Sequence, residues 1–124
     1  MLDHLSIQVA DPDASKAFYE TVLAPLGGTA IMSFGPVTGF GKGFPDFWIG
    51  PIGDAGAAHH DIHLAFTAGS RDEVLAFVEA ARALGAEVLH EPRVWPEYHE
   101  TYFGGFVRDP DGNNVEAVHH GFDR

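Results

Sequence analysis

Two histidines and one glutamate are the residues of this chain whose types are best suited to chemistry. Glu116 lies in an otherwise apolar run, where a carboxylate costs several kcal/mol unless it is paired, hydrogen-bonded or bound to a metal. His4 and His63 each stand at the start of a run that is typical of a strand. Nitrogen and oxygen ligands of this kind suit Fe, Mn, Zn or Ni, and three of them leave coordination positions open for a substrate. The three residues are therefore the candidate ligands of a divalent metal ion.

Each of the three residues also has a simpler interpretation. His4 can be a polar side chain on the exposed face of the first strand, and His63 can be an ordinary surface histidine. Glu116 can lie on the solvated face of an edge strand. Spacing alone does not decide between these interpretations, because the three residues are far apart in the sequence.

An internal repeat relates the two histidines. His4 and His63 are separated by 59 residues, and so are Phe18 and Phe77 in the helices that are expected to follow. Such a repeat predicts a duplicated βαβββ module whose halves pair in one sheet system. The expected fold is α+β, with two paired βαβββ modules forming a curved, mostly antiparallel sheet around a cleft. In that fold the two histidines are pseudo-symmetric and converge with Glu116.

The elements that position these residues follow from periodicity and turn chemistry. Helices are expected after Asp11-Pro12, with Asp11 as the N-cap, and after Ser70, which forms a capping box with Glu73. A turn at Asp109–Gly112 joins the last two strands as a hairpin. Strands are expected at residues 2–10, 29–34, 37–41, 44–49, 59–66, 87–90, 101–108 and 114–119. Residues 50–58 are expected to be a crossover, and residues 91–100 a loop.

Composition narrows the class of protein. At 124 residues we expect one domain over 1–124, with repeat one at about 1–50 and repeat two at about 59–120. A formal charge of −11 with seven Lys and Arg argues against a nucleic-acid partner. The absence of cysteine excludes disulfides and thiolate ligands. No signal-peptide pattern and no membrane-spanning apolar run is present, so we expect a cytoplasmic protein with a small-molecule substrate.

Three segments carry a resemblance to a known family. They are Asp3–Ile7 together with Phe18-Tyr19, then His63–Phe66, and finally Phe106–Glu116, which is the most specific. In these segments the chain resembles the vicinal oxygen chelate superfamily, which contains glyoxalase I, extradiol ring-cleaving dioxygenases and bleomycin- or fosfomycin-resistance proteins. The resemblance spans the whole chain. It implies the paired βαβββ fold, a homodimer, and a divalent metal (Fe, Mn, Zn or Ni) at His4, His63 and Glu116.

One position departs from the glyoxalase pattern. Glyoxalase I has a fourth ligand, a carboxylate, on the last strand of its first repeat. Trp48 stands at the matching place in this chain, and Asp46 lies two residues earlier. The resemblance therefore does not imply a lactoylglutathione lyase. It implies either other lyase or isomerase chemistry or that of a ring-cleaving dioxygenase, whose members use three ligands.

Several further residues are candidates for the substrate site. His99 is a candidate general acid or base, and Tyr102 a candidate hydrogen-bond donor to an oxyanion. The alternative is a surface loop whose aromatic side chains pack onto the sheet. The candidate pocket residues are Trp48, Phe47, Arg93, Tyr98 and Phe106. We expect His59 and His60 to lie on the surface, and His119 and His120 not to be ligands.

Three functions therefore remain open at this point. The first is a metalloenzyme that chelates vicinal oxygens of a small organic substrate. The second is a non-catalytic, antibiotic-sequestering binder that needs no metal. The third is a protein that keeps a metal only for its structure.

Overall fold

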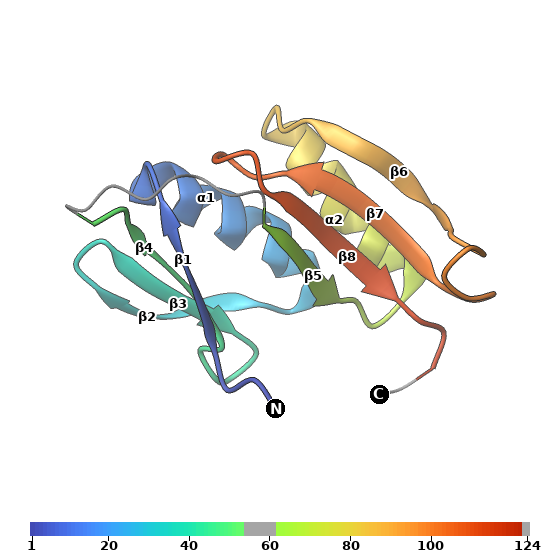
Figure 1. Ribbon diagram of the computed structural model, residues 1–124, viewed down its shortest axis with the longest axis horizontal. Coiled ribbons are helices and arrows are strands. Elements are labelled where there is room, and N and C mark those ends of the chain that lie inside the picture. Colours follow the sequence, from blue (N-terminus) through green and yellow to red (C-terminus); the bar gives the residue numbers. More distant parts are fainter. Residues whose placement is uncertain (54–61, 123–124) are drawn as a thin grey trace. The chain divides into compact units, whose positions relative to one another are not determined.

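The structure is a computed structural model that describes residues 1–53 and 62–122. The chain divides into two units, Met1–His60 and Asp61–Arg124, and each unit contains one β-strand, one helix and three further strands in that order (Figure 1). The predicted α+β fold of two βαβββ modules is confirmed. The two units are described separately below, and His59 and His60 lie outside the described residues.

Unit 1 is a four-stranded sheet with one helix. Its strands are β1 (Leu5–Val9), β2 (Thr29–Phe34), β3 (Val37–Gly41) and β4 (Phe47–Pro51), in the order β1-β4-β3-β2. β1 and β4 run parallel, and the other pairs are antiparallel. Helix α1 (Pro12–Leu23) begins where the Asp11 side chain accepts a hydrogen bond from the Ala14 N–H at 3.1 Å, as the sequence predicts. A short 3-10 turn, Ala24–Leu26, follows the helix.

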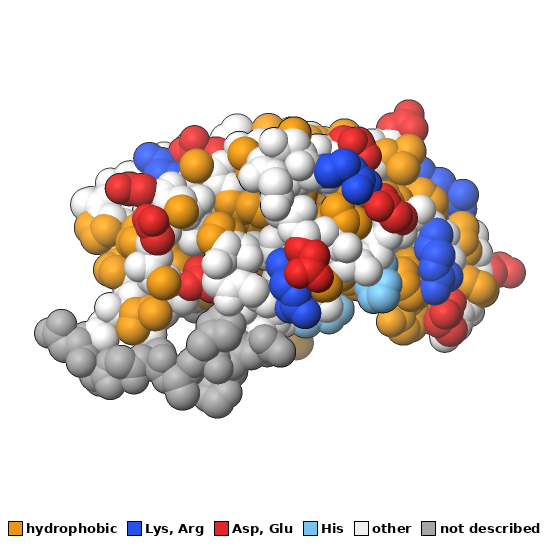
Figure 2. All heavy atoms as spheres, turned by 90° about the horizontal axis from the view of Figure 1, so that it is seen from above, with side chains coloured by type: hydrophobic (Ala, Val, Ile, Leu, Met, Phe, Trp, Pro, Cys, Tyr) orange, Lys and Arg blue, Asp and Glu red, His pale blue; other side chains and the backbone are white. Residues whose placement is uncertain are grey.

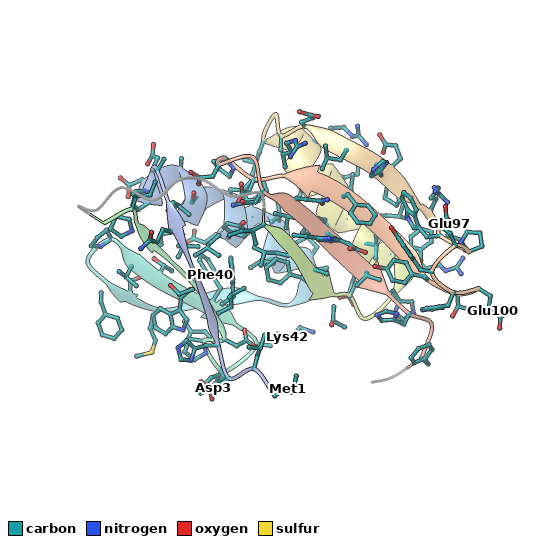
Figure 3. All side chains as sticks on the ribbon, in the orientation of Figure 1. Met1, Asp3, Phe40, Lys42, Glu97 and Glu100 are labelled. Atoms are coloured by element: carbon teal, nitrogen blue, oxygen red, sulfur yellow. The ribbon has the colours of Figure 1, made fainter. Side chains whose placement is uncertain are left out.

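Strand alternation divides the residues of unit 1 between two faces of its sheet. On the helix-covered face, Phe40 and Phe47 pack around Tyr19 of α1, which is fully buried. Figure 3 labels Phe40 on β3. Successive strand residues point to opposite faces, so Trp48 and its β1 partner Ser6 lie on the face away from the helix. The other buried apolar residues of the unit are Ile7, Val9, Phe18, Val22, Leu23, Leu26 and Ile49.

Unit 2 repeats this plan. Its strands are β5 (His63–Thr67), β6 (Val88–Val94), β7 (Phe103–Arg108) and β8 (Asn114–His119), in the order β5-β8-β7-β6, and α2 (Arg71–Ala83) covers one face (Figure 1). β5 and β8 are parallel. Residues 115 and 117 of β8 are buried beneath the helix, so residue 116 lies on the opposite face. The helix contributes Val74, Phe77, Val78 and Ala81 to the core.

The hairpin that carries Glu116 has the predicted turn. The Asp109 carboxylate accepts hydrogen bonds from the N–H groups of Asp111 at 2.9 Å and Asn113 at 2.8 Å. Gly112 has a φ of 84°, a conformation that side chains with a Cβ rarely adopt. The turn fixes the register in which Phe106 on β7 lies opposite Glu116 on β8.

The largest differences from the predicted strand boundaries are in β4 and β6. β4 begins at Phe47 instead of residue 44 and continues to Pro51, inside the expected crossover. β6 runs to Val94 through Pro92, where a loop was expected. β6 is an edge strand, and its register shifts between His90 and Arg93, so the missing N–H of Pro92 breaks no regular ladder.

Several exposed ion pairs lie on the surface of the chain. Figure 2 shows acidic and basic side chains beside one another on the surface. Arg82 contacts Glu79 at 3.2 Å and Glu91 at 2.5 Å, and Arg93 contacts Glu97 at 3.3 Å. Exposed pairs of this kind contribute little to stability. In the described part of the chain, no helix combines the length and the apolar character needed to cross a membrane.

Removing the cap of α2 is expected to destabilise the chain modestly. The Ser70 hydroxyl accepts a hydrogen bond from the Glu73 N–H at 3.2 Å, and the Glu73 carboxylate accepts one from the Gly69 N–H at 3.1 Å. Ser70→Ala should lower the free energy of unfolding by about 1 kcal/mol, because a helix N–H loses its partner. Urea denaturation measures this change. A midpoint equal to that of the unchanged protein would show that the cap contributes nothing.

Candidate metal and substrate site

The buried carboxylate of Glu116 is the centre of the candidate site. Glu116 is only 1% exposed on the open face of the unit 2 sheet. Its Oε1 lies 2.8 Å from Nε2 of His63, whose side chain is 54% exposed. Its Oε2 accepts a hydrogen bond from the hydroxyl of Tyr102. The sequence-predicted pair of His63 and Glu116 therefore lies together, with one side of the imidazole open to solvent.

Tyr102 holds the second oxygen of this carboxylate. Burial, and then the hydrogen bond to Glu116, raise the pKa of Tyr102 well above its usual value. The phenol therefore keeps its proton and donates it toward the carboxylate. Gly104 lies close beside it, since a Cβ there would be 3.0 Å from Glu116 Oε2. Tyr102 thus orients Glu116 so that Oε1 faces the histidine.

The spacing of these two groups suits a shared metal ion. Two ligand atoms at right angles, each about 2.1 Å from a metal, lie about 3 Å apart. In the structure His63 Nε2 and Glu116 Oε1 are hydrogen-bonded to each other at 2.8 Å, a separation close to that value. One imidazole nitrogen and one carboxylate oxygen are also the ligand types that Fe, Mn, Ni and Zn accept. The two residues therefore fit a divalent cation.

His4 in unit 1 is oriented by its neighbour. Its Nδ1 lies 2.8 Å from the carboxylate of Asp3, and the ring is 58% exposed. Asp3 precedes β1 near the N-terminus (Figure 3). Metal-binding histidines usually donate their second N–H to a carboxylate in this way, which leaves the other nitrogen as the ligand atom. The pair of Asp3 and His4 therefore leaves Nε2 of His4 for a ligand.

The candidate ligands fall into two groups, one in each unit. His63 and Glu116 lie together in unit 2, and His4 lies with Asp3 in unit 1. Across residues 1–53 and 62–122, no three His, Asp or Glu side chains are already grouped as a metal site. Convergence of His4 with the unit 2 pair stays a prediction.

Strand register identifies the counterpart of Glu116 in unit 1. Glu116 pairs with Ala65 of β5, two residues after His63, and Trp48 pairs with Ser6 of β1, two residues after His4. Trp48 therefore occupies in unit 1 the position that Glu116 occupies in unit 2. An indole stands where a fourth carboxylate ligand would otherwise be placed.

A pocket of about 360 Å³ opens on this face of unit 1. Its size falls within the range of small-molecule sites. The lining is mostly apolar, with Trp48 and Phe44 as its aromatic residues and His4 with Asp3 at its polar side. The pocket therefore brings a predicted metal ligand and a predicted substrate-pocket residue, His4 and Trp48, to one surface.

His99 belongs to a separate cluster in unit 2. The Thr101 N–H donates to Nδ1 of His99 at 3.2 Å, so in the neutral ring Nε2 carries the proton and donates it to Nδ1 of His120 at 3.0 Å. The His99 ring packs against Tyr102 with centroids 5.4 Å apart. His119 donates from Nδ1 to the Ala68 carbonyl at 3.1 Å. His99 is thus near the Tyr102 ring, while its two nitrogens are engaged with Thr101 and His120.

The other predicted pocket residues divide between core and surface. Phe47 is buried under α1, 4.8 Å from the ring of Tyr19, so it lines the core of unit 1. Phe106 lies beside His63, with ring centroids 5.9 Å apart. The Arg93 guanidinium lies 3.4 Å above the Trp95 ring. Tyr98 is more than half exposed and packs on Trp95 and Tyr102.

A family comparison now bears on this geometry. The family model described as the Glyoxalase/Bleomycin resistance protein/Dioxygenase superfamily matches residues 1–117. The chain belongs to this superfamily. Membership supports the fold and leaves the metal and the reaction open.

Solved structures agree with membership of the superfamily. A glyoxalase/bleomycin resistance protein from Albidiferax ferrireducens T118 is 28% identical, with a TM-score of 0.79 over 94% of this chain and 96% of that one. A putative glyoxalase from Bacillus halodurans is 24% identical, with a TM-score of 0.75 over 96% of this chain and 95% of that one. A lactoylglutathione lyase from Agrobacterium tumefaciens is 24% identical, with a TM-score of 0.70 over 94% and 90%. The last two show the fold alone. A search of curated proteins found no significant match.

Two site residues of this superfamily member were missed by sequence reasoning. Asp3 was quoted only as part of a motif, although a carboxylate next to a candidate ligand is a signal for an orienting partner. Gly39 is not among the predicted site residues, yet it lies beneath Trp48. Only the pairing of β3 with β4 shows which glycine faces the indole, and sequence does not give that register.

Tyr102 is expected to resist ionisation in the metal-free protein. Its pKa is raised on folding, so its contribution to stability is complete below about pH 10 and is lost as the pH rises further, because the unfolded chain then releases the proton first. The ultraviolet absorbance of tyrosinate, followed during an alkaline titration of folded protein, measures this effect. Wild type and Tyr102→Phe should show equal amplitudes near pH 10. A smaller amplitude in the variant would contradict the expectation.

Proposed function

We propose that this protein is a divalent-metal-dependent enzyme that acts on a small organic substrate, with His4, His63 and Glu116 as the metal ligands. The observation that carries the proposal is the buried Glu116 carboxylate, held by Tyr102 and directed at His63 Nε2 at 2.8 Å. Both carboxylate oxygens already have a protein partner, and the arrangement supports a metal because the imidazole and Oε1 meet at a position where the ring is open to solvent. The orientation of His4 by Asp3 adds support for the third ligand.

The chain's own residues have separate roles in this proposal. The bound metal would supply Lewis acidity that stabilises negative charge on vicinal substrate oxygens. Tyr102 keeps its proton on Oη and fixes the orientation of Glu116. His99 donates from Nε2 to Nδ1 of His120 at 3.0 Å and packs against Tyr102, and it is the proposed general acid or base. Trp48 and Phe44 exclude water from one side of the substrate.

The reaction we propose is of the lyase, isomerase or ring-cleaving dioxygenase type. The lactoylglutathione lyase among the similar structures supports the fold only, and Trp48 stands at the place of a fourth ligand. Loss of that carboxylate removes a group that could hold metal and move a proton. We therefore do not extend the proposal to the glutathione-linked reaction. We also propose a homodimer, as the resemblance implies.

Adding metal to chelator-treated protein tests the proposal. Fe(II), Mn(II), Ni(II) and Zn(II) are added singly, and the melting temperature is measured by calorimetry. At a hundredfold excess over Kd, a bound ion adds about 2.7 kcal/mol to the free energy of unfolding, which raises the melting temperature by at least about 5 °C. Mg(II), which prefers an all-oxygen shell, is the matched control. If none of the four metals changes the melting temperature, the metalloenzyme proposal fails.

A metal-free binding protein is the second candidate. The apolar pocket around Trp48 in unit 1 favours it, because that pocket needs no metal to hold a ligand. In this case a ligand would bind equally well before and after chelator treatment. The enzyme proposal instead expects the chelator to abolish turnover.

A further inference from the structure

The two units differ at one equivalent pair of facing strand residues. In unit 2, Glu116 on β8 lies opposite Phe106 on β7. At the equivalent pair in unit 1, Trp48 on β4 lies opposite Gly39 on β3. Unit 2 therefore places a carboxylate beside a phenyl ring, and unit 1 places an indole beside a residue without a side chain.

The glycine lets the indole lie flat on the sheet. A Cβ built on Gly39 would be 2.8 Å from each of three ring atoms of Trp48, namely Cη2, Cζ2 and Cζ3. Such a distance is too short for any real side chain, and all three atoms belong to the indole. One face of the ring therefore rests on the backbone of β3, while Trp48 also lines the open pocket.

Two contacts hold the indole in this position. Its Nε1–H donates to the Pro45 carbonyl at 2.8 Å, which fixes the rotation of the ring. The Phe34 ring is nearly parallel to it, with an angle of 16° and centroids 6.2 Å apart. Phe34 and Phe44 are themselves 61% and 55% exposed. The surface is thus a fixed aromatic wall bordered by exposed phenyl rings.

We propose that Trp48, laid on Gly39, is a stacking platform for a planar aromatic ring of the substrate, and that this ring is neutral or cationic. The inference deepens the proposed function and rests on it. The ring belongs to a substrate only if the enzyme proposal holds, and His4, a proposed metal ligand, lines the same pocket. A fixed indole face favours a flat π-system over a saturated ring of equal size, since the stacking energy is added to the burial of apolar area.

The charges around the pocket select against an anionic ring. Asp3 contributes a carboxylate to the lining, and no lysine or arginine is among the described lining residues. The whole chain carries a formal charge of −11. In the metal-free protein, a carboxylated ring would therefore approach a negative surface without a partner, whereas a cationic ring gains from both the indole face and Asp3.

The binding experiment uses the full chain after chelator treatment, so that it does not depend on a metal. The probes are 2-naphthol, the N-methylquinolinium cation, 2-naphthoate and the saturated decahydro-2-naphthol. The NMR signal of the Trp48 Nε1–H reports binding at the indole, and calorimetry gives Kd. We expect 2-naphthol and N-methylquinolinium to bind about three- to tenfold more tightly than decahydro-2-naphthol. 2-Naphthoate should bind the most weakly of the aromatic probes.

Two variants and one control test whether the preference for flat rings comes from the indole of Trp48. Trp48→Leu removes the platform, and Gly39→Ala keeps the indole but lifts it from the strand, so each should remove the preference for flat rings. Leu75→Ala changes an exposed apolar residue on α2 and should leave all four affinities unchanged. Gly39→Ala keeps the test valid if Trp48→Leu folds poorly.

Three results would overturn the inference. These are equal affinity for naphthol and its saturated counterpart, preferred binding of 2-naphthoate, and a flat-ring preference that survives both variants. Absence of probe binding together with a Trp48→Leu-sensitive dimer in sedimentation would also overturn it, because the surface would then belong to a second copy of the chain. Failure of metal binding with intact naphthol binding would overturn only the proposed function.

Discussion

Glu116→Gln is expected to weaken divalent-metal binding by at least about 100-fold while the chain stays folded. Loss of an orienting partner of a metal ligand typically costs 10- to about 100-fold, and loss of a ligand's charge should cost no less. Glutamine has nearly the same shape, so its amide oxygen can still accept the Tyr102 hydroxyl, and the buried side chain keeps a partner. Isothermal titration with Mn(II) measures the affinity.

A matched variant separates ligand loss from a general change in charge. Glu91→Gln removes one exposed carboxylate that pairs with Arg82, and it should leave metal affinity within about twofold. Glu116→Ala should lower affinity as much as Glu116→Gln but also destabilise the chain by about 1–3 kcal/mol, because the Tyr102 hydroxyl loses its acceptor. Unchanged Mn(II) affinity in Glu116→Gln would move the site away from this carboxylate.

His4→Ala is expected to weaken the binding of Mn(II) by at least about tenfold. This variant tests whether unit 1 supplies a ligand to the pair in unit 2. His4 is exposed, so its removal should leave the melting temperature of the metal-free protein unchanged. The same Mn(II) titration gives the answer.

Gln8→Ala is the matched control for this variant. Gln8 lies on β1 and shares the alternation of His4, which directly precedes the strand, but it lacks an imidazole, so its replacement should have no effect on Mn(II) binding. An equal loss in both variants would indicate a structural disturbance of β1. No loss in either would leave His63 and Glu116 without their proposed third ligand.

Much of the fold could be predicted because local signals agreed with one another. The Asp11 and Ser70 caps, the Asp109–Gly112 turn and the 59-residue repeat each specify local structure, and together they give two βαβββ modules. The pairing of His63 with Glu116 was also within reach, because both stand on strands whose alternation places them on the open face.

The features of the site and fold that could not be predicted depend on contacts between strands. Sequence alone could not say which of Phe47 and Trp48 faces the pocket, because a one-residue change of register exchanges the two faces. Tyr102 was expected to donate to a bound oxyanion, whereas in the structure it donates to Glu116. The length of β6 was missed because a proline predicts a loop unless a bulge accommodates it.

Elemental analysis tests the central claim most directly. Protein purified without chelator is analysed by mass spectrometry for metal per chain, beside Glu116→Gln, His63→Ala and His4→Ala prepared in the same way. If His4, His63 and Glu116 hold a divalent ion, the unchanged protein carries close to one transition-metal ion per chain, and each variant carries almost none. A metal-free wild type that takes up no added Fe(II), Mn(II), Ni(II) or Zn(II), or a full metal content in Glu116→Gln, would contradict the claim.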